Sequence, residues 1–216
     1  MADQSAIISA HPSGSAFANR IARYFFLGLE EVMGTHGLLS TLEVAGLAQY
    51  YTALPPDNLA RSVDFSVFSA LNLALDEMYG PRGGRGMALR AGRAWLVKGL
   101  NNFGVMAGIN DPAFRALPWE ERVRLGLRAL SLVFTHFSDQ HVRLEDSPQV
   151  FRFIIERSAM AWARRAERPV CHPFVGLLQE TCRWASNGRD LAVRETECSA
   201  AGAAACLFVI NKTPLS

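Results

Sequence analysis

Lysine is scarce in this chain, and its scarcity limits the kinds of partner that the protein can bind. Only two lysines occur, Lys98 and Lys212, and arginine supplies the remaining permanent positive charge. The 22 lysines and arginines are nearly balanced by 20 aspartates and glutamates, so the formal net charge is only +2. Because nucleic-acid binding depends on clustered cations that neutralise phosphates, the composition predicts a protein that does not bind nucleic acid.

Long apolar runs are absent as well. No segment approaches the roughly 18 consecutive apolar residues of a membrane span, and the longest candidate, residues 200–210, contains Gly202 and Cys206. Residues 1–14 have neither the basic start nor the apolar stretch of a signal peptide. We therefore expect a cytoplasmic protein that does not contact membranes. In that compartment, its four cysteines are expected to be free thiols or metal ligands.

Signatures of catalytic sites are also missing. No G-x-G-x-x-G follows a predicted strand, and no G-x-S-x-G nucleophile motif occurs. The glycine-rich segment 80–86 lacks the Gly-Lys-Ser/Thr ending of a phosphate-binding loop, and we interpret it as a mobile connector. The five histidines are scattered without partners at metal or triad spacing. The sequence therefore favours a protein without catalytic activity.

Apolar residues recur at three- and four-residue intervals through the first two thirds of the chain, a spacing typical of helices with one buried face. We expect Ser15 to cap the first helix. The predicted helices span residues 15–33, 37–48, 65–80, 87–106 and 119–137.

From residue 141 the apolar period changes to two, the spacing of a strand with one buried face. Residues 141–145 and 150–156 are predicted to form a hairpin, and a helix at 173–185 and strands at 191–196 and 206–210 follow. Helices followed by an antiparallel sheet indicate an α+β domain. We expect a single domain over residues 15–212, with the N-terminal helices packed on one antiparallel sheet, and a flexible N-terminus over residues 1–14.

The strongest chemical pattern is an E-x-x-C-x7-C array made by Glu195, Cys198 and Cys206, with Cys171 upstream. Three thiols and one carboxylate are a complete tetrahedral set for structural zinc, with no open position for water. Strand alternation places Glu195 on the buried face, where a carboxylate needs a metal or an opposite charge. The array therefore predicts a metal that fastens the last hairpin to the preceding helix.

The residues leave alternatives to this zinc set open. Glu195 could instead pair with an arginine such as Arg189 or Arg194. His172 or Glu197 could replace one of the ligands. Cys182, eleven residues beyond Cys171 on nearly the same helical face, is interpreted as a core thiol.

Aromatic and soft apolar side chains are more abundant than a minimal core needs, which favours a cavity between helices and sheet. Most ligand pockets are apolar with a few polar groups that orient the ligand. The predicted pocket residues are Trp95, Phe103, Met106, Phe134, His136, Phe151, Phe153, Trp162 and Phe174.

These motifs resemble a known family. An F-x-I strand, a P-V-C at the start of a helix, and an ordered V-x-E-x-x-C-x-A-x-G-x(3)-C-x-F-x-I tail are similar to the 4-vinyl-reductase-type, hydrocarbon-binding domain. The N-terminal half resembles it less specifically, through Gly28-Leu29-Glu30, Tyr79-Gly80 and Gly92-Arg93, so that the likeness covers about residues 17–210. The tail matches at Val193, Glu195, Cys198, Ala200, Gly202, Cys206, Phe208 and Ile210.

The resemblance implies a fold like that of TRAPP vesicle-tethering subunits and a homodimer built from the N-terminal helices. In relatives that sense aromatic compounds, a structural zinc is held by a Cys before the helix and then by Glu, Cys and Cys, which assigns zinc to Cys171, Glu195, Cys198 and Cys206. Phenol sensors hold the phenol hydroxyl with a histidine and a tryptophan. His136 and Trp162 are residues of those types in roughly the corresponding region.

Three functions follow as hypotheses. The leading one is a zinc-stabilised domain that binds a small hydrophobic ligand, aromatic or tetrapyrrole-like, as a sensor or carrier without turnover. The second is an accessory protein or enzyme for 8-vinyl reduction in (bacterio)chlorophyll biosynthesis. The third is a TRAPP-like dimeric scaffold without a ligand.

Overall fold

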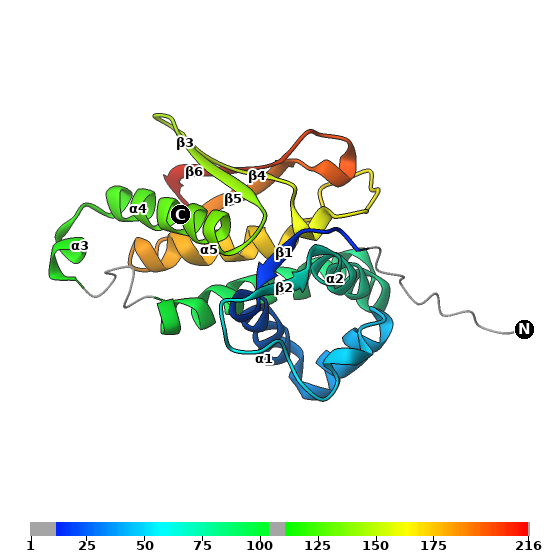
Figure 1. The fold of residues 1–216 in the computed structure, drawn as a ribbon. Helices are drawn as coiled ribbons and strands as arrows, with labels where there is room; N and C mark the ends of the chain where they lie inside the picture. Colours follow the sequence, from blue (N-terminus) through cyan, green and yellow to red (C-terminus); the bar gives the residue numbers. More distant parts are fainter. Residues whose placement is uncertain (1–11, 104–110, 216) are drawn as a thin grey trace, which may run out of the picture.

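The computed structural model describes residues 12–103 and 111–215 and confirms the α+β class. A four-stranded antiparallel sheet lies over helices α4 (Trp119–Phe137) and α5 (His172–Ala185), as Figure 1 shows. Helices α1 (Asn19–Val44) and α2 (Phe65–Phe103) form the layer on the other side of α5. The short helix α3 (Pro112–Ala116) precedes α4.

The main sheet has the order β3-β4-β6-β5. Its strands are β3 (His141–Asp146), β4 (Val150–Glu156), β5 (Leu191–Glu197) and β6 (Cys206–Pro214), and all neighbours are antiparallel. Burial alternates along β6, where Cys206, Phe208 and Ile210 are fully buried and face the helices. The two predicted C-terminal hairpins are therefore confirmed, since a period of two specifies which face of each strand is covered.

The predicted break at residues 80–86 is wrong. The helices expected at 65–80 and 87–106 are joined as α2, and Gly80 is the one residue inside it with a non-helical backbone conformation. Its φ of 68° lies in the left-handed region, which glycine adopts without strain, so the chain kinks there and the helix resumes at once. Pro81 suits the first turn of the resumed helix, where its missing N–H is not needed. The helices expected at 15–33 and 37–48 are likewise joined as α1, around a kink at Gly34.

A second, two-stranded sheet was not predicted. Strands β1 (Ala16–Ala18) and β2 (Arg61–Asp64) pair in antiparallel fashion, so the protein has two sheets where one was expected. Ser15 does not cap the first helix, because residues 16–18 are extended and α1 begins only at Asn19. Asp64 accepts hydrogen bonds from the backbone N–H groups of Ser13 and Gly14, which fixes the chain just before β1.

The layers meet at a very close contact between α2 and α5. A Cβ atom added to Gly92 would lie 1.9 Å from the carbonyl oxygen of Pro173, and one added to Gly176 would lie 2.0 Å from that of Leu89. The two helix backbones can approach this closely because both contact positions lack a side chain. This crossing fixes α5, which carries residues of both sites described below.

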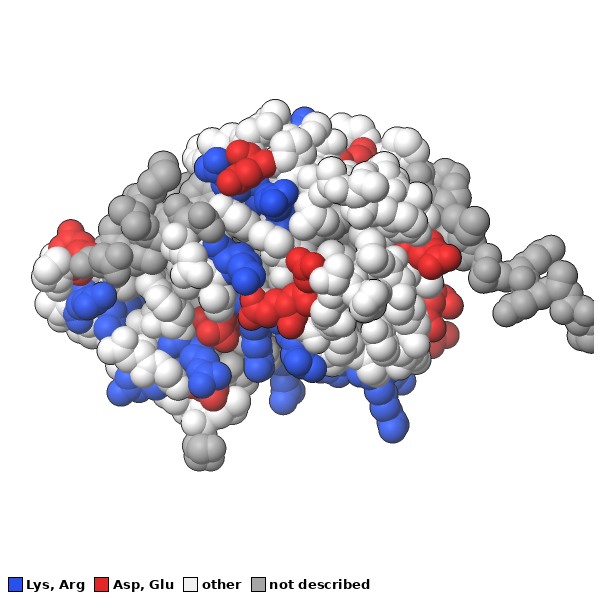
Figure 2. Space-filling view, turned by 90° about the horizontal axis from the view of Figure 1, so that it is seen from below, with Lys and Arg blue, Asp and Glu red and all other residues white. Residues whose placement is uncertain are grey.

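Residues 1–11 of the expected flexible N-terminus lie outside the described residues, as do residues 104–110. Among the helices that the structure describes, none combines the length and apolarity required of a membrane span. On the face shown in Figure 2, basic and acidic side chains are interspersed with broad uncharged areas, as the near-zero net charge suggests.

Candidate metal centre and ligand cavity

Four side chains converge where α5 meets the β5–β6 hairpin. Cys171 lies immediately before α5, Glu195 is in β5, Cys198 directly follows β5, and Cys206 begins β6. One ligand atom from each residue lies within 4.8 Å of all the others. The structure thus brings together all four residues of the predicted zinc set.

A bulge in β5 explains how the E-x-x-C spacing works. In a regular strand, residues three apart point to opposite faces. The register shifts between Glu195 and Glu197, which pair with Phe208 and Leu207 respectively, so that Thr196 is an extra residue. Because such a bulge re-aims the side chains that follow it, Glu195 and Cys198 can face the same centre.

The sulfur atoms are spaced as ligands of one tetrahedral ion would be. The Sγ–Sγ distances are 4.0 Å between Cys171 and Cys198, 3.6 Å between Cys171 and Cys206, and 3.8 Å between Cys198 and Cys206. Two sulfurs that each lie about 2.3 Å from a shared tetrahedral zinc are about 3.8 Å apart. All three thiols are free and buried. The donor set therefore fits a thiolate-binding metal.

The carboxylate of Glu195 supports the same interpretation. Its Oε2 accepts a 2.8 Å hydrogen bond from the backbone N–H of Cys171, whereas its Oε1 is buried and has no hydrogen-bond partner among the described residues. Burial, and then the neighbouring Cys198, raise the pKa of Glu195 to about 8. A cation beside Oε1 would satisfy the oxygen and favour the ionised form.

Hydrogen bonds from surrounding groups hold the sulfurs. Hydrogen bonds from the thiols of Cys171 and Cys198 lower the pKa of Cys206 to about 4, while burial raises the pKa of Cys171 well above its usual value. The backbone N–H of Ser199 also donates to the sulfur of Cys206 at 3.4 Å, and the hydroxyl of Ser158 lies 3.3 Å from the sulfur of Cys171. Such contacts to metal-binding thiolates orient the ligands.

The alternatives to this ligand set can be placed as well. The cluster found among the described residues contains neither His172 nor Glu197, and Glu197 is exposed. No ion pair between Glu195 and Arg189 or Arg194 occurs in the described part of the chain. Cys182 is fully buried in the core.

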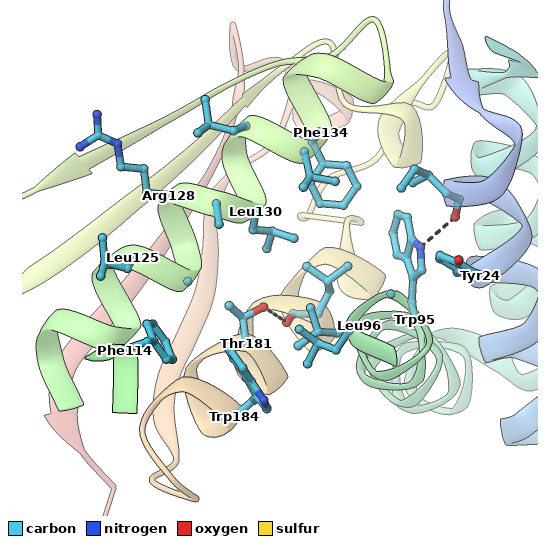
Figure 3. A pocket seen from close by; sticks show the side chains of 18 residues that line it. Tyr24, Trp95, Leu96, Phe114, Leu125, Arg128, Leu130, Phe134, Thr181 and Trp184 are labelled. Atoms are coloured by element: carbon cyan, nitrogen blue, oxygen red, sulfur yellow. Dashed lines mark hydrogen bonds between the residues drawn. The ribbon is translucent and has the colours of Figure 1, made fainter. Parts of the chain in front are cut away.

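A cavity of about 370 Å³ lies beyond the same helix. Its walls come from α2, α4 and α5, with contributions from α1 and α3, and Figure 3 shows the side chains around it. On α5, Leu177, Thr181 and Trp184 follow one another at helical spacing and make one wall. Because α5 begins at the metal centre and lines the cavity further along, a single helix connects the two sites.

Polar groups in this cavity are few. The indole N–H of Trp95 donates to the carbonyl oxygen of Ile21 at 3.0 Å, and the hydroxyl of Thr181 donates to that of Leu177 at 2.8 Å. Arg128 lines the cavity with its stem, while Figure 3 shows its guanidinium pointing away. An apolar chamber with a small number of polar groups is typical of small-molecule sites.

The structure distributes the predicted pocket residues over several places. Trp95 and Phe134 line the cavity. Phe174 lies behind that wall, with its ring centre 5.7 Å from that of Trp95. Phe151 and Phe153 are buried in the sheet core. Of the remaining four, His136 and Trp162 are not among the lining residues, and the Phe103 side chain and Met106 lie outside what the structure describes.

Several lining residues were missed by reasoning from the sequence. Phe114 and Trp184 stack with ring centres 5.8 Å apart, and Leu125 and Thr181 also line the cavity. The amphipathic pattern of α4 and α5 could have identified one face of each helix. It could not reveal that these two faces would leave a space between them.

Comparisons with known proteins place the fold. The chain resembles an Fe(II) unliganded H-NOX protein from K. algicida, with a TM-score of 0.56, 12% identity and coverage of 91% of this chain and 96% of the other. It also resembles an H-NOX protein from S. oneidensis in the Fe(II)NO state, with a TM-score of 0.55, 13% identity and coverage of 90% and 99%. The fold is therefore H-NOX-like, whereas likeness to TRAPP subunits stays a prediction.

A third structure is the phenol-responsive sensory domain of the transcription activator PoxR with phenol, which matches with a TM-score of 0.49, 17% identity and coverage of 70% and 77%. No curated protein matches the chain. A family model, that of the vinyl-4-reductase domain, matches residues 151–212, which hold β4, α5 and the whole metal centre. The chain therefore carries a domain of the 4-vinyl-reductase type, as its C-terminal motifs predicted.

Proposed function

We propose that this protein is a metal-stabilised domain that binds a small aromatic molecule and works as a sensor or carrier without turnover. The observation that carries the proposal is the apolar cavity between α2, α4 and α5. A cavity of about 150 Å³ lined by apolar side chains is large enough to bind benzene. The volume here, about 370 Å³, suits a ligand of two fused rings better than a single ring.

The lining chemistry supports an aromatic ligand over a haem. Among the described lining residues, Tyr24 is the only one of a kind that ligates haem iron, since no histidine, cysteine or methionine is present. The rings of Trp95, Phe114, Phe134 and Trp184 offer faces and edges to a planar molecule. The two similar H-NOX structures are of Fe(II) proteins, and we do not extend that iron to this chain.

Zinc is the metal that we propose for the cluster. Three thiolates and one carboxylate complete a tetrahedral shell, so the ion would have no open position and would serve structure only. When bound, it would supply positive charge to the buried oxygen of Glu195 and tie Cys171, at the start of α5, to the β5–β6 hairpin. The metal thereby stabilises the helix that forms one wall of the cavity.

A ligand-free scaffold and an assembly through the N-terminal helices are weaker alternatives. A scaffold needs no internal space, and the cavity gives a reason to prefer the binding role. The homodimer stays a prediction that sedimentation of the purified protein would test. A vinyl-reducing role would require turnover of a divinyl substrate in the presence of reductant, which absorbance spectra would detect.

Filling the cavity tests the proposed function directly. Gly99 lies on the α2 wall, and a Cβ atom added there would have no neighbouring heavy atom within 4 Å. Gly99→Leu should place its side chain in the open space and lower the affinity for 2-naphthol, measured by calorimetry, by about tenfold or more. The fold should be retained, since replacing a helical glycine by leucine favours the helix by about 0.5–1 kcal/mol.

A matched control lies in the same helix. Gly86 also has free space around an added Cβ, and it does not line the cavity. Gly86→Leu should therefore bind 2-naphthol as the unmodified protein does. Equal affinity in both variants, or no binding by the unmodified protein to this or related two-ring compounds, would refute the cavity as the ligand site.

A further inference from the structure

One hydroxyl in the cavity wall is placed to select among ligands. Thr181 is only 3% exposed and lies on the α5 face that lines the cavity, between Phe114 and Leu96 in Figure 3. Its hydroxyl hydrogen is directed to the carbonyl oxygen of Leu177, at an Oγ1–O distance of 2.8 Å. A hydroxyl has one hydrogen and two lone pairs. Once the hydrogen is committed to the helix, the oxygen can act only as an acceptor.

The other polar groups of the cavity do not compete for this acceptor. Among the described residues, no hydrogen bond is donated to Thr181 Oγ1. The indole N–H of Trp95 is directed to Ile21, and the guanidinium of Arg128 points out of the cavity. Figure 3 shows Tyr24 at the far end, beside Trp95. A donor on a ligand that lies against α5 would therefore find its partner in Thr181.

We propose that Thr181 is a specificity-determining residue, which makes the cavity prefer fused aromatic ligands that carry an N–H or O–H donor over ligands of the same shape without one. This inference rests on the proposed function of the cavity. A buried N–H or O–H without an acceptor loses its hydrogen bonds to water and gains nothing in return. The donor-bearing ligand is thus favoured only while the threonine oxygen is present.

Indole and benzofuran test this preference, because they share one shape and differ in an N–H that replaces a ring oxygen. Calorimetric titration of the unmodified protein should give indole roughly a two- to tenfold higher affinity than benzofuran. Thr181→Val removes the hydroxyl with little change in shape. In that variant the ratio should fall to one or reverse, while benzofuran binds as well as before.

Further variants separate loss of the hydrogen bond from loss of the fold. Thr181→Ser keeps the oxygen and should keep the indole preference. Thr181→Ala, which also lacks the oxygen, should lose the preference as the valine variant does, and benzofuran binding reports that both variants are folded.

The outcomes distinguish the two proposals. Equal affinity of the unmodified protein for the two compounds, or an indole preference that survives in Thr181→Val, would overturn the role of Thr181 and leave the cavity as a ligand site. Binding of neither compound, nor of 2-naphthol, would overturn the ligand site and the inference together.

Discussion

The crossing of α2 and α5 gives the sharpest structural prediction, through the substitution Gly92→Ala. The added methyl group would lie 1.9 Å from the carbonyl oxygen of Pro173 and 3.0 Å from the backbone nitrogen of Leu177. Contacts of Cβ atoms below 3.0 Å are essentially never observed, so the helices must separate by at least about 1 Å. The clashing atom is backbone, and no side-chain rotation can relieve the contact.

The energy follows from this displacement. A radial gap of about 0.5–1 Å forfeits a quarter to a half of the dispersion energy of the contacts involved, and overpacked cores lose about 1–3 kcal/mol or more. Against this, alanine favours a helix over glycine by about 1 kcal/mol. We expect a net loss of about 3 kcal/mol, which in a domain of this size lowers Tm by about 6–12 °C. Because α5 carries Cys171 and part of the cavity wall, metal content and ligand affinity should fall too.

Thermal and urea unfolding followed by circular dichroism would measure the effect. Gly86→Ala is the control, since nothing lies within 4 Å of its added Cβ atom, and it should raise stability by about 0.5–1 kcal/mol. A Gly92→Ala protein that unfolds at or above the midpoint of the unmodified protein would refute the close crossing of the two helices.

Two further predictions concern the metal centre and the N-terminal segment. Cys206→Ser should lower zinc content by elemental analysis and Tm together, because metal binding contributes to folding free energy, whereas Cys182→Ser should leave zinc bound; unchanged zinc in the first variant would exclude Cys206 as a ligand. Burial alone would raise the pKa of Asp64, but hydrogen bonds from Ser66 and Ser13 lower it below its ordinary value of 3.8. A depressed carboxyl pKa gives stability that is complete above the unfolded pKa and is lost as the pH falls through the folded value. Asp64→Asn should therefore lower stability by about 1–2 kcal/mol at pH 7 and weaken its dependence on pH below about 4; an unchanged acid-unfolding curve would contradict the assignment.

The sequence predicted best where one local pattern determines the structure. The C-terminal strands were found because alternation of Cys206, Phe208 and Ile210 specifies both a strand and its buried face. The ligand set followed from the spacing of thiols and carboxylate. The bulge at Thr196, which lets Glu195 and Cys198 face one centre, has no signal in the residues themselves, because it depends on pairing with β6.

Features that depend on distant contacts were not predictable in this way. Strands β1 and β2 contain only three and four residues, too few for a period to emerge, and they exist because they pair with each other. The helix after Gly80 was mistaken for a connector because glycines and a proline suppress helix propensity locally, while packing of Trp95 and Leu96 in the core stabilises the helix. Cavity residues such as Thr181 were missed because a space between helices is a property of their assembly.

The distances among the three sulfurs also have a practical consequence at the bench. A tetrahedral, thiolate-rich position that holds colourless zinc should also accept cobalt(II), whose visible absorption is intense when sulfur surrounds it. A cobalt-exchanged sample would change colour as the hairpin detaches from the helix. Titrating such a sample with aromatic compounds would then reveal, in an ordinary spectrophotometer, whether events in the chamber reach the far end of α5.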